Sequence, residues 1–158
     1  MTPSRKIYLA SSWRNADQPF AVEILRSYGH EVYDFRNPPG GILNGFRWSE
    51  LDPDWEMWTA DQYRNGLKKP LAQRGFNSDF DAMKWAEVGI LFLPCGRSAH
   101  LEIGWMAGFG KPTIVWTRNG QEPELMALLC GEICINEREV LAALAREPSI
   151  SQATETGG

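Results

Sequence analysis

An almost unbroken apolar run from Val88 to Leu93 (VGILFL) restricts the possible folds of this chain more than any other feature. A run of this kind indicates a strand covered on both faces, because a strand with one solvated face alternates apolar and polar residues. Strands buried in this way occur mainly in parallel sheets, whose crossover helices lie on the two faces. The run therefore predicts the central strand of an α/β domain.

Shorter apolar runs and helical segments alternate on either side of this strand. We expect further strands at 6–10, 31–35, 112–116 and 132–135, and helices at 17–28, 54–72, 78–87, 99–109, 123–129 and 137–146. Gly29 and Gly110 are placed to end two of these helices. This order predicts a doubly wound α/β fold of the flavodoxin-like or Rossmann-like kind, with a parallel five-stranded sheet and helices on both faces.

The chain is long enough for one domain. Its 158 residues and apolar share of 43% suit a single core. We expect that domain over residues 1–147, followed by a polar, aperiodic and flexible tail at 148–158. Residues 37–53 are rich in Gly, Pro and aromatics and have neither helical nor strand periodicity, which predicts a long loop of the kind that often carries function.

Composition disfavours several classes of partner and site. A net charge of −4 with scattered Lys and Arg argues against a nucleic-acid polymer. No window approaches the roughly 20 apolar residues of a spanning helix, and the N-terminus does not resemble a signal peptide, so we expect a cytoplasmic protein without membrane contact. Cys95, Cys130 and Cys134 are expected to be reduced thiols. Because Cys130 and Cys134 have no second ligand pair nearby, we expect no metal, and nothing in the sequence implies another cofactor.

Function is expected at the carboxyl edge of the sheet, where doubly wound folds bind their ligands. Three polar loops, at 11–15, 34–44 and 95–98, follow the first three strands. The predicted helix at 78–87 runs antiparallel to the following strand, so its N-terminus lies at the same edge. Asp79 and Asp81 belong to that N-terminus, and we expect Asp79 to lie near Glu102.

Glu102 is the most unusual acid in the sequence. It interrupts a helical stripe formed by Ala99, Met106 and Phe109, which should face the sheet. A buried face rarely accepts an unpaired charge. The nearby helix N-terminus is expected to keep this carboxylate ionised and nucleophilic, although a surface acid stabilised by the helix dipole would give the same pattern.

The other polar candidates have ordinary alternatives. Asp79 could be a common first-turn acid, with Ser78 and Asp81 forming a capping box. Ser12 and Arg14 could bind an anion, but they lack the glycine pattern of a phosphate loop and could equally lie in a solvated loop. The tryptophans of the long loop, Trp48, Trp55 and Trp58, could stack on a nucleobase.

Several motifs resemble those of the nucleoside 2-deoxyribosyltransferase superfamily, which includes deoxyribosyl transferases and nucleoside 5′-monophosphate N-glycosidases. The resemblance spans most of residues 6–116. It rests on Ile7-Tyr8 in the first strand, on Asp79 ahead of the third, and on the block SAHLEIGW at 98–105 followed by Gly110-Lys111-Pro112.

The resemblance implies a role for three residues. Glu102 would be the nucleophile that takes the sugar at C1′, Asp79 would protonate or hydrogen-bond the departing base, and Tyr8 would help to hold the nucleophile. Two carboxylates with these roles suit an oxocarbenium-like reaction. The resemblance also implies a homo-oligomer, at least a dimer.

The substrate class stays open between a free nucleoside and a nucleoside monophosphate. Gly96 stands where the transferases have an Asp that contacts the sugar 5′-hydroxyl, which disfavours a free nucleoside. Ser12 and Arg14 stand where the monophosphate glycosidases have a Ser and an Arg for the phosphate, and Ser98 could add a donor at a helix N-terminus. Those glycosidases, however, usually have a Ser at the position of Gly96, so transferase and monophosphate hydrolase are both expected possibilities.

Two further functions fit the same sequence. One is a non-catalytic nucleotide-binding module, because a fold does not guarantee chemistry. The other is an interaction protein that docks a partner on the aromatic loop, through Phe46, Trp48, Trp55 and Trp58.

Overall fold

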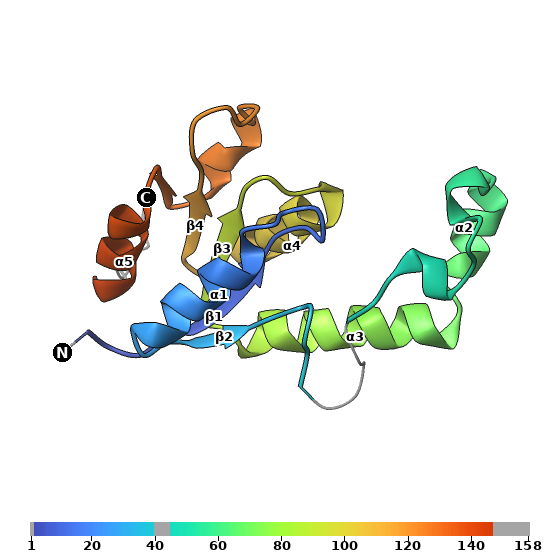
Figure 1. The fold of residues 1–158 in the computed structure, drawn as a ribbon, viewed down its shortest axis with the longest axis horizontal. Coiled ribbons are helices and arrows are strands. Elements are labelled where there is room, and N and C mark those ends of the chain that lie inside the picture. The colour runs from blue at the N-terminus through green and yellow to red at the C-terminus, as the bar shows by residue number, and fades with distance from the viewer. Residues whose placement is uncertain (1, 40–44, 147–158) are drawn as a thin grey trace, which may run out of the picture.

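The computed structural model describes residues 2–39 and 45–146, and these build a parallel sheet in the order β2-β1-β3-β4-β5 with helices on both faces (Figure 1). The strands are β1 (Lys6–Ala10), β2 (Glu31–Tyr33), β3 (Val88–Phe92), β4 (Thr113–Trp116) and β5 (Glu132–Cys134). The predicted doubly wound fold and all five predicted strands are confirmed. The predicted tail at 148–158, and residues 40–44 of the predicted loop, lie outside the described residues.

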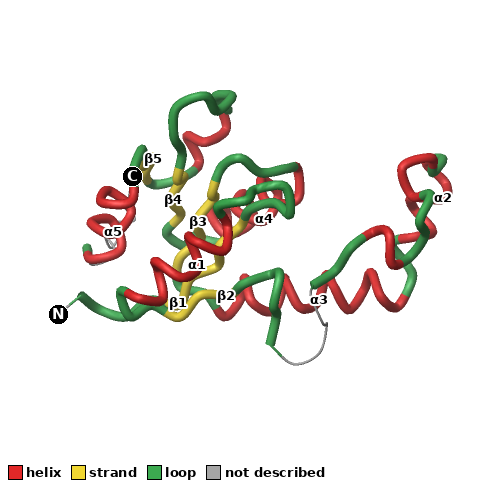
Figure 2. Tube along the Cα trace, viewed as in Figure 1, coloured by secondary structure: helices red, strands yellow, loops and turns green. Residues whose placement is uncertain are grey.

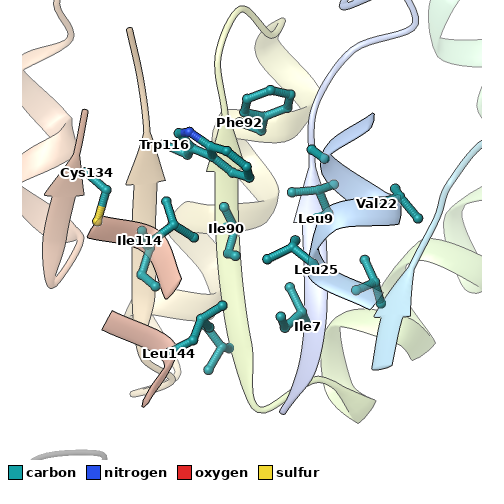
Figure 3. Packing of buried hydrophobic residues seen from close by; sticks show 14 residues of the cluster. Ile7, Leu9, Val22, Leu25, Ile90, Phe92, Ile114, Trp116, Cys134 and Leu144 are labelled. Atoms are coloured by element: carbon teal, nitrogen blue, oxygen red, sulfur yellow. The ribbon is translucent and has the colours of Figure 1, made fainter. Parts of the chain in front are cut away.

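The two faces of the sheet have separate cores. Ile7 and Leu9 of β1 point toward α1 (Gln18–Ser27) and α5 (Glu137–Ala145), as part of one apolar cluster (Figure 3). Tyr8 and Ala10 point to the other face, toward α3 (Pro70–Trp85) and α4 (Arg97–Gly108). Strand side chains alternate between faces, so β1 contributes to both cores at once.

The central strand is buried along its whole length, as predicted for 88–93. Gly89 lets α4 approach this strand closely. A Cβ atom at Gly89 would lie 2.8 Å from Ile103 Cδ1 and 2.9 Å from Met106 Sδ, both on α4. This close packing holds the second half of α4 against the amino-terminal end of β3.

The region between β2 and β3 differs from the prediction. The predicted helix at 54–72 is replaced by a 3-10 turn at Trp55–Met57 and a short α2 (Ala60–Gly66), and another 3-10 turn spans Trp48–Glu50. The helix α3 begins at Pro70, a residue suited to the first helical turn, and runs without a break to Trp85. The predicted helix start at 78 is therefore wrong.

Gly75 lies in the gap predicted between the helices at 54–72 and 78–87, but the structure places it inside α3, where it is buried. A Cβ atom there would come within 2.9 Å of Phe46 Cβ and Cγ, so the glycine provides the space in which Phe46 packs. As a result α3 extends well beyond the sheet, with α2 over its far end (Figure 2). The last predicted helix before β5 is a 3-10 turn, Leu125–Leu129, whereas α5 is close to its predicted range.

Aromatic residues from the segment that precedes α3 pack together in a layer beside its extended part. Trp48 packs edge-on against Phe46 at 5.0 Å, against Trp58 at 5.8 Å and against Tyr63 at 6.3 Å between ring centres. Gly66 makes this possible, because a Cβ atom there would lie 2.5 Å from the Trp58 ring. Among the described residues, no helix is long and apolar enough to cross a membrane.

Candidate active site

A cavity of 830 Å³ opens at the carboxyl ends of β1, β2 and β3. Most of the predicted site residues line it, namely Tyr8, Ser12, Arg14, Trp48, Trp55, Asp79, Gly96, Ser98 and Glu102. It is also lined by residues that sequence analysis did not single out for the site, including Trp13, Tyr33, Arg47, Cys95 and Arg97. The cavity thus opens at the edge of the sheet where topology predicted the site.

Glu102 and Asp79 face the same cavity from two helices. Glu102 lies in the second turn of α4, and Asp79 lies in the middle of α3, and both side chains are half-buried. Because α3 projects beyond the sheet, its middle reaches the sheet edge and its first turn lies farther out. The prediction placed Asp79 at the edge where the structure has it, but for the wrong reason, because no helix begins at residue 78.

The electrostatics of Glu102 differ from the prediction. Burial and, to a lesser extent, the negative charge of Asp79 together raise the pKa of Glu102 to about 7, although hydrogen bonding by Tyr8 lowers it. A carboxyl group held fully ionised by the helix N-terminus, as expected, would have a lowered pKa; burial, the largest cause, raises it instead. The predicted apolar stripe also needs correction, since Phe109 is 66% exposed while Ala99 and Met106 are buried.

Asp79 is perturbed in the same direction. Burial raises the pKa of Asp79 to about 6, and a hydrogen bond from Tyr33 opposes the rise. Two carboxyl groups with pKa values near neutrality, in one cavity, can exchange a proton with a bound molecule at physiological pH.

Each acid has a tyrosine donor. Tyr8 and Tyr33 occupy the same register position of the paired strands β1 and β2, and their rings stack at 5.4 Å with an angle of 11°. The Tyr33 hydroxyl donates to Asp79 Oδ1 at 2.8 Å and lies 3.0 Å from Ser78 Oγ. Burial, with the charges of the two acids, raises the pKa of both tyrosines, so both remain protonated donors.

Tyr33 is the main residue of this group that sequence analysis did not identify. A signal existed, because KIY and EVY place a tyrosine at the same step of two adjacent parallel strands. Recognising it required the register, which apolar patterning alone does not fix.

Asp81 is a predicted site residue that does not line the cavity, and neither does Trp58, which could have stacked on a base. Asp81 is exposed, and its carboxylate pairs with Lys84 Nζ at 3.0 Å along α3. It lines a separate hollow of 630 Å³ between β2 and α3. The alternative in which Ser78 and Asp81 form a capping box is also wrong, since both residues lie inside a helix.

The cavity is open beside the start of α4, and arginines from three segments of the chain line it. Gly96 precedes the first residue of α4, and a Cβ atom there would meet nothing within 4 Å, so the glycine leaves room in the cavity. Three exposed arginines, Arg14, Arg47 and Arg97, also line the cavity. The site therefore combines acids on α3 and α4 with cations near its opening.

Cys95 and His100 do not form a thiolate pair. The Cys95 Sγ lies 3.8 Å from His100 Nδ1, which is itself 2.8 Å from the Gly96 carbonyl oxygen. Burial, with the charge of Glu102, raises the pKa of Cys95 to about 12, so the thiol stays protonated. In residues 2–39 and 45–146, no group of three His, Cys, Asp or Glu side chains is arranged to hold a metal ion.

No family model and no curated protein matches the sequence. Among solved structures, a 2-deoxyribosyltransferase from the psychrotolerant bacterium Bacillus psychrosaccharolyticus is similar, with a TM-score of 0.54 and 22% identity over 90% of this chain and 97% of that one. A conserved protein from Enterococcus faecalis V583 has a TM-score of 0.54 and 12% identity, over 90% and 98% of the two chains. A CMP N-glycosidase from Clostridium botulinum aligns with a TM-score of 0.47 and 19% identity, over 87% and 96%. The likeness to the 2-deoxyribosyltransferase is one of fold over nearly the full length of both chains, and it agrees with the resemblance carried by the sequence motifs.

Proposed function

We propose that this chain is an enzyme that cleaves the N-glycosidic bond of a nucleoside or nucleotide through a covalent glycosyl intermediate on Glu102. The observation that carries the proposal is the pair of half-buried carboxyl groups, Glu102 and Asp79, in one cavity with a separate tyrosine beside each. The family resemblance of the sequence motifs assigns the same two acids.

In the proposed first step, a carboxylate oxygen of Glu102 attacks C1′ of the sugar while the bond from C1′ to the base nitrogen breaks. The electron pair of that bond leaves with the base, and Asp79 supplies the proton that neutralises it. In the second step, water or a second base attacks C1′ and releases the Glu102 carboxylate, and Asp79 takes up the proton. Transfer and hydrolysis differ only in this acceptor.

The reaction needs one proton on the two acids. With pKa values of about 6 and about 7, the coupled pair carries a single proton near neutral pH. A positive charge developing at C1′ favours the ionised form of Glu102, and a basic nitrogen beside Asp79 favours delivery of the proton from that acid. Tyr8 supports the charged form of Glu102 by hydrogen bonding.

The second candidate function is a hydrolase that releases free base from a nucleoside 5′-monophosphate. Arg14, Arg47 and Arg97 line the cavity, and Ser12 and Ser98 add hydroxyl donors. The open space at Gly96 accommodates a bulky anion. The aromatic wall, which includes Trp48, offers a surface on which the base would stack.

The test is release of free base from a panel of nucleosides and their 5′-monophosphates, followed by chromatography. We expect release by the wild-type chain, and loss by at least about a thousandfold in Glu102→Ala, the scale seen when a covalent nucleophile is removed. Glu23→Gln, on the exposed side of α1, is the matched control and should retain full activity. Addition of a second free base then separates transfer from hydrolysis.

The opposite results favour the other functions. Tight binding of a nucleotide with no base released would support a non-catalytic binding module. Loss of self-association on substitution of Trp58, which does not line the cavity, with activity unchanged, would support docking through the aromatic loop. By the family resemblance we also propose a homo-oligomer, at least a dimer, which light scattering at several protein concentrations would test.

A further inference from the structure

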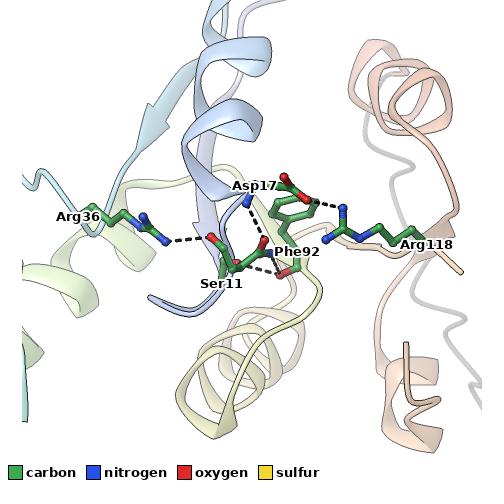
Figure 4. Close-up of polar contacts among 6 residues, drawn as sticks. Ser11, Asp17, Arg36, Phe92 and Arg118 are labelled. Atoms are coloured by element: carbon green, nitrogen blue, oxygen red, sulfur yellow. Dashed lines mark hydrogen bonds and ion pairs between the residues drawn. The ribbon is translucent and has the colours of Figure 1, made fainter. Parts of the chain in front are cut away.

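Arg36, in the segment that follows β2, binds the loop that follows β1. Its terminal nitrogen Nη2 lies among three backbone carbonyl oxygens of residues 12–15, at 3.3 Å from Ser12, 3.1 Å from Trp13 and 2.9 Å from Asn15. Figure 4 shows the guanidinium reaching this loop from the side of β2. We call residues 12–15 the β1 loop.

The contact orients the peptide groups of the β1 loop. In a trans peptide the carbonyl and the N–H of one unit point in opposite directions. Carbonyls that point toward Arg36 therefore turn the N–H groups of the following residues, among them Trp13 and Arg14, away from it. Among the described residues, the Trp13 N–H donates to no acceptor, whereas the Arg14 N–H donates to Ser12 Oγ at 3.1 Å.

Both sides of this arrangement are fixed. Asp34, which is buried, accepts from the Arg36 N–H at 3.0 Å and from Gln18 Nε2 at 2.9 Å, so the backbone that carries Arg36 is held. At the other side, Asn15 is buried and its Nδ2 donates to Ser11 Oγ at 3.1 Å. Ser11 in turn donates to the carbonyl of Phe92, at the end of β3, at 2.9 Å.

Arg36 also holds a side chain of the cavity wall. Its guanidinium lies over the Trp13 ring at 5.2 Å, and Arg47 lies at 4.3 Å from the same ring. Trp13, Arg14 and Arg47 line the cavity, but Arg36 does not. Arg36 therefore reaches the site only through the residues that it holds.

We propose that Arg36 is a positioning residue that holds the β1 loop in an anion-binding conformation, in which Ser12, Arg14 and the Trp13 N–H receive a phosphate group of the substrate. The identification of that phosphate as the 5′-phosphate of a nucleotide rests on the proposed function. The positioning itself does not, because it follows from the contacts of Arg36 with the loop.

The test compares Arg36→Gln with Arg36→Lys. Glutamine removes the charge and the fork of donors, and lysine keeps the charge but ends short of the three carbonyls and cannot stack as a plane on Trp13. In both variants we expect faster amide hydrogen exchange at residues 13–16, weaker binding of inorganic phosphate by calorimetry, and a KM for a 5′-monophosphate raised about tenfold or more with kcat nearly retained. If Arg36→Gln does not fold, Arg36→Lys alone carries the same measurements.

A matched control is available at Arg5. Its side chain also donates to backbone carbonyls, those of Leu144 at 3.2 Å and Arg146 at 2.8 Å, but it contacts neither the β1 loop nor the cavity. Arg5→Gln should leave exchange at residues 13–16, phosphate binding and KM unchanged. An equal effect of Arg5→Gln on these three quantities would overturn the proposal, since Arg36 would then act through general stability.

The remaining outcomes also decide the question. Unchanged exchange in the Arg36 variants, or full rescue by lysine, would overturn the proposal, the second by showing that charge alone matters. If the wild-type chain releases no base, but its phosphate binding weakens in the Arg36 variants as expected, the proposed function fails and the positioning role stands. If base is released with phosphate binding independent of Arg36, the positioning role fails and the function stands.

Discussion

Replacement of Tyr33 by phenylalanine removes one hydroxyl from the site and leaves the ring in place. The lost hydroxyl donates to Asp79 Oδ1 at 2.8 Å, whereas the ring stack with Tyr8 is retained. A hydrogen bond to a charged group contributes about 1.5–3 kcal/mol, and about 1.4 kcal/mol corresponds to one pH unit. Because the donor favours the ionised form of Asp79, its loss should raise the pKa of this acid above its present value of about 6.

The consequence appears in the pH dependence of kcat. The proposed reaction needs a protonated Asp79, so activity falls when this acid loses its proton at high pH. A higher pKa keeps the proton on Asp79 longer, and the alkaline limb of the profile in Tyr33→Phe should move upward by up to about one pH unit, because Glu102 shares the same proton. Tyr28→Phe, at an exposed position after α1, is the matched control and should leave the limb in place. An unchanged or lowered alkaline limb in Tyr33→Phe would refute this account of Asp79.

Variants at four other positions test the electrostatics and the packing described above. The folded-state pKa values of Asp79 and Glu102 lie above ordinary carboxyl values, so the folded chain binds more protons than the unfolded chain and loses stability as pH rises from about 4 to 7. Asp79→Asn and Glu102→Gln should therefore each raise Tm at pH 8 by a few degrees, as measured by calorimetry. A lowered Tm would contradict this. Gly75→Ala places a methyl group against Phe46 and should lower the free energy of unfolding by about 1–3 kcal/mol in urea titration, whereas no change would show that α3 does not pack as described. Gly96→Asp fits the open space and should raise KM for a 5′-monophosphate much more than for a free nucleoside, by charge repulsion, and equal effects would argue against a phosphate at this wall.

The sequence predicted the sheet well because its strands depend on local patterning. The run at 88–93 and the glycines at 29 and 110 specify a buried strand and two helix ends, and both glycines adopt positive φ angles, of 89° and 90°. The carboxyl edge then follows from topology, and this brought most of the predicted site residues to one cavity.

The parts that were not predicted depend on contacts between distant residues. Gly75 breaks isolated helices, but here its missing side chain admits Phe46 and the helix continues. The protonation of Glu102 depends on burial and on Asp79, which no local pattern reveals. Arg36 and Tyr33 act across strands that are paired only in the folded chain.

The central claim is that Glu102 forms a covalent bond to the sugar. Mass spectrometry of the peptide that contains Glu102, after rapid acid quenching of a reaction with a cleavable nucleoside or nucleotide, measures this directly. The account predicts a peptide heavier by one glycosyl group, with the modification on Glu102 and absent from Glu102→Ala. Base release without any modified peptide, or a glycosyl group on another residue, would contradict it.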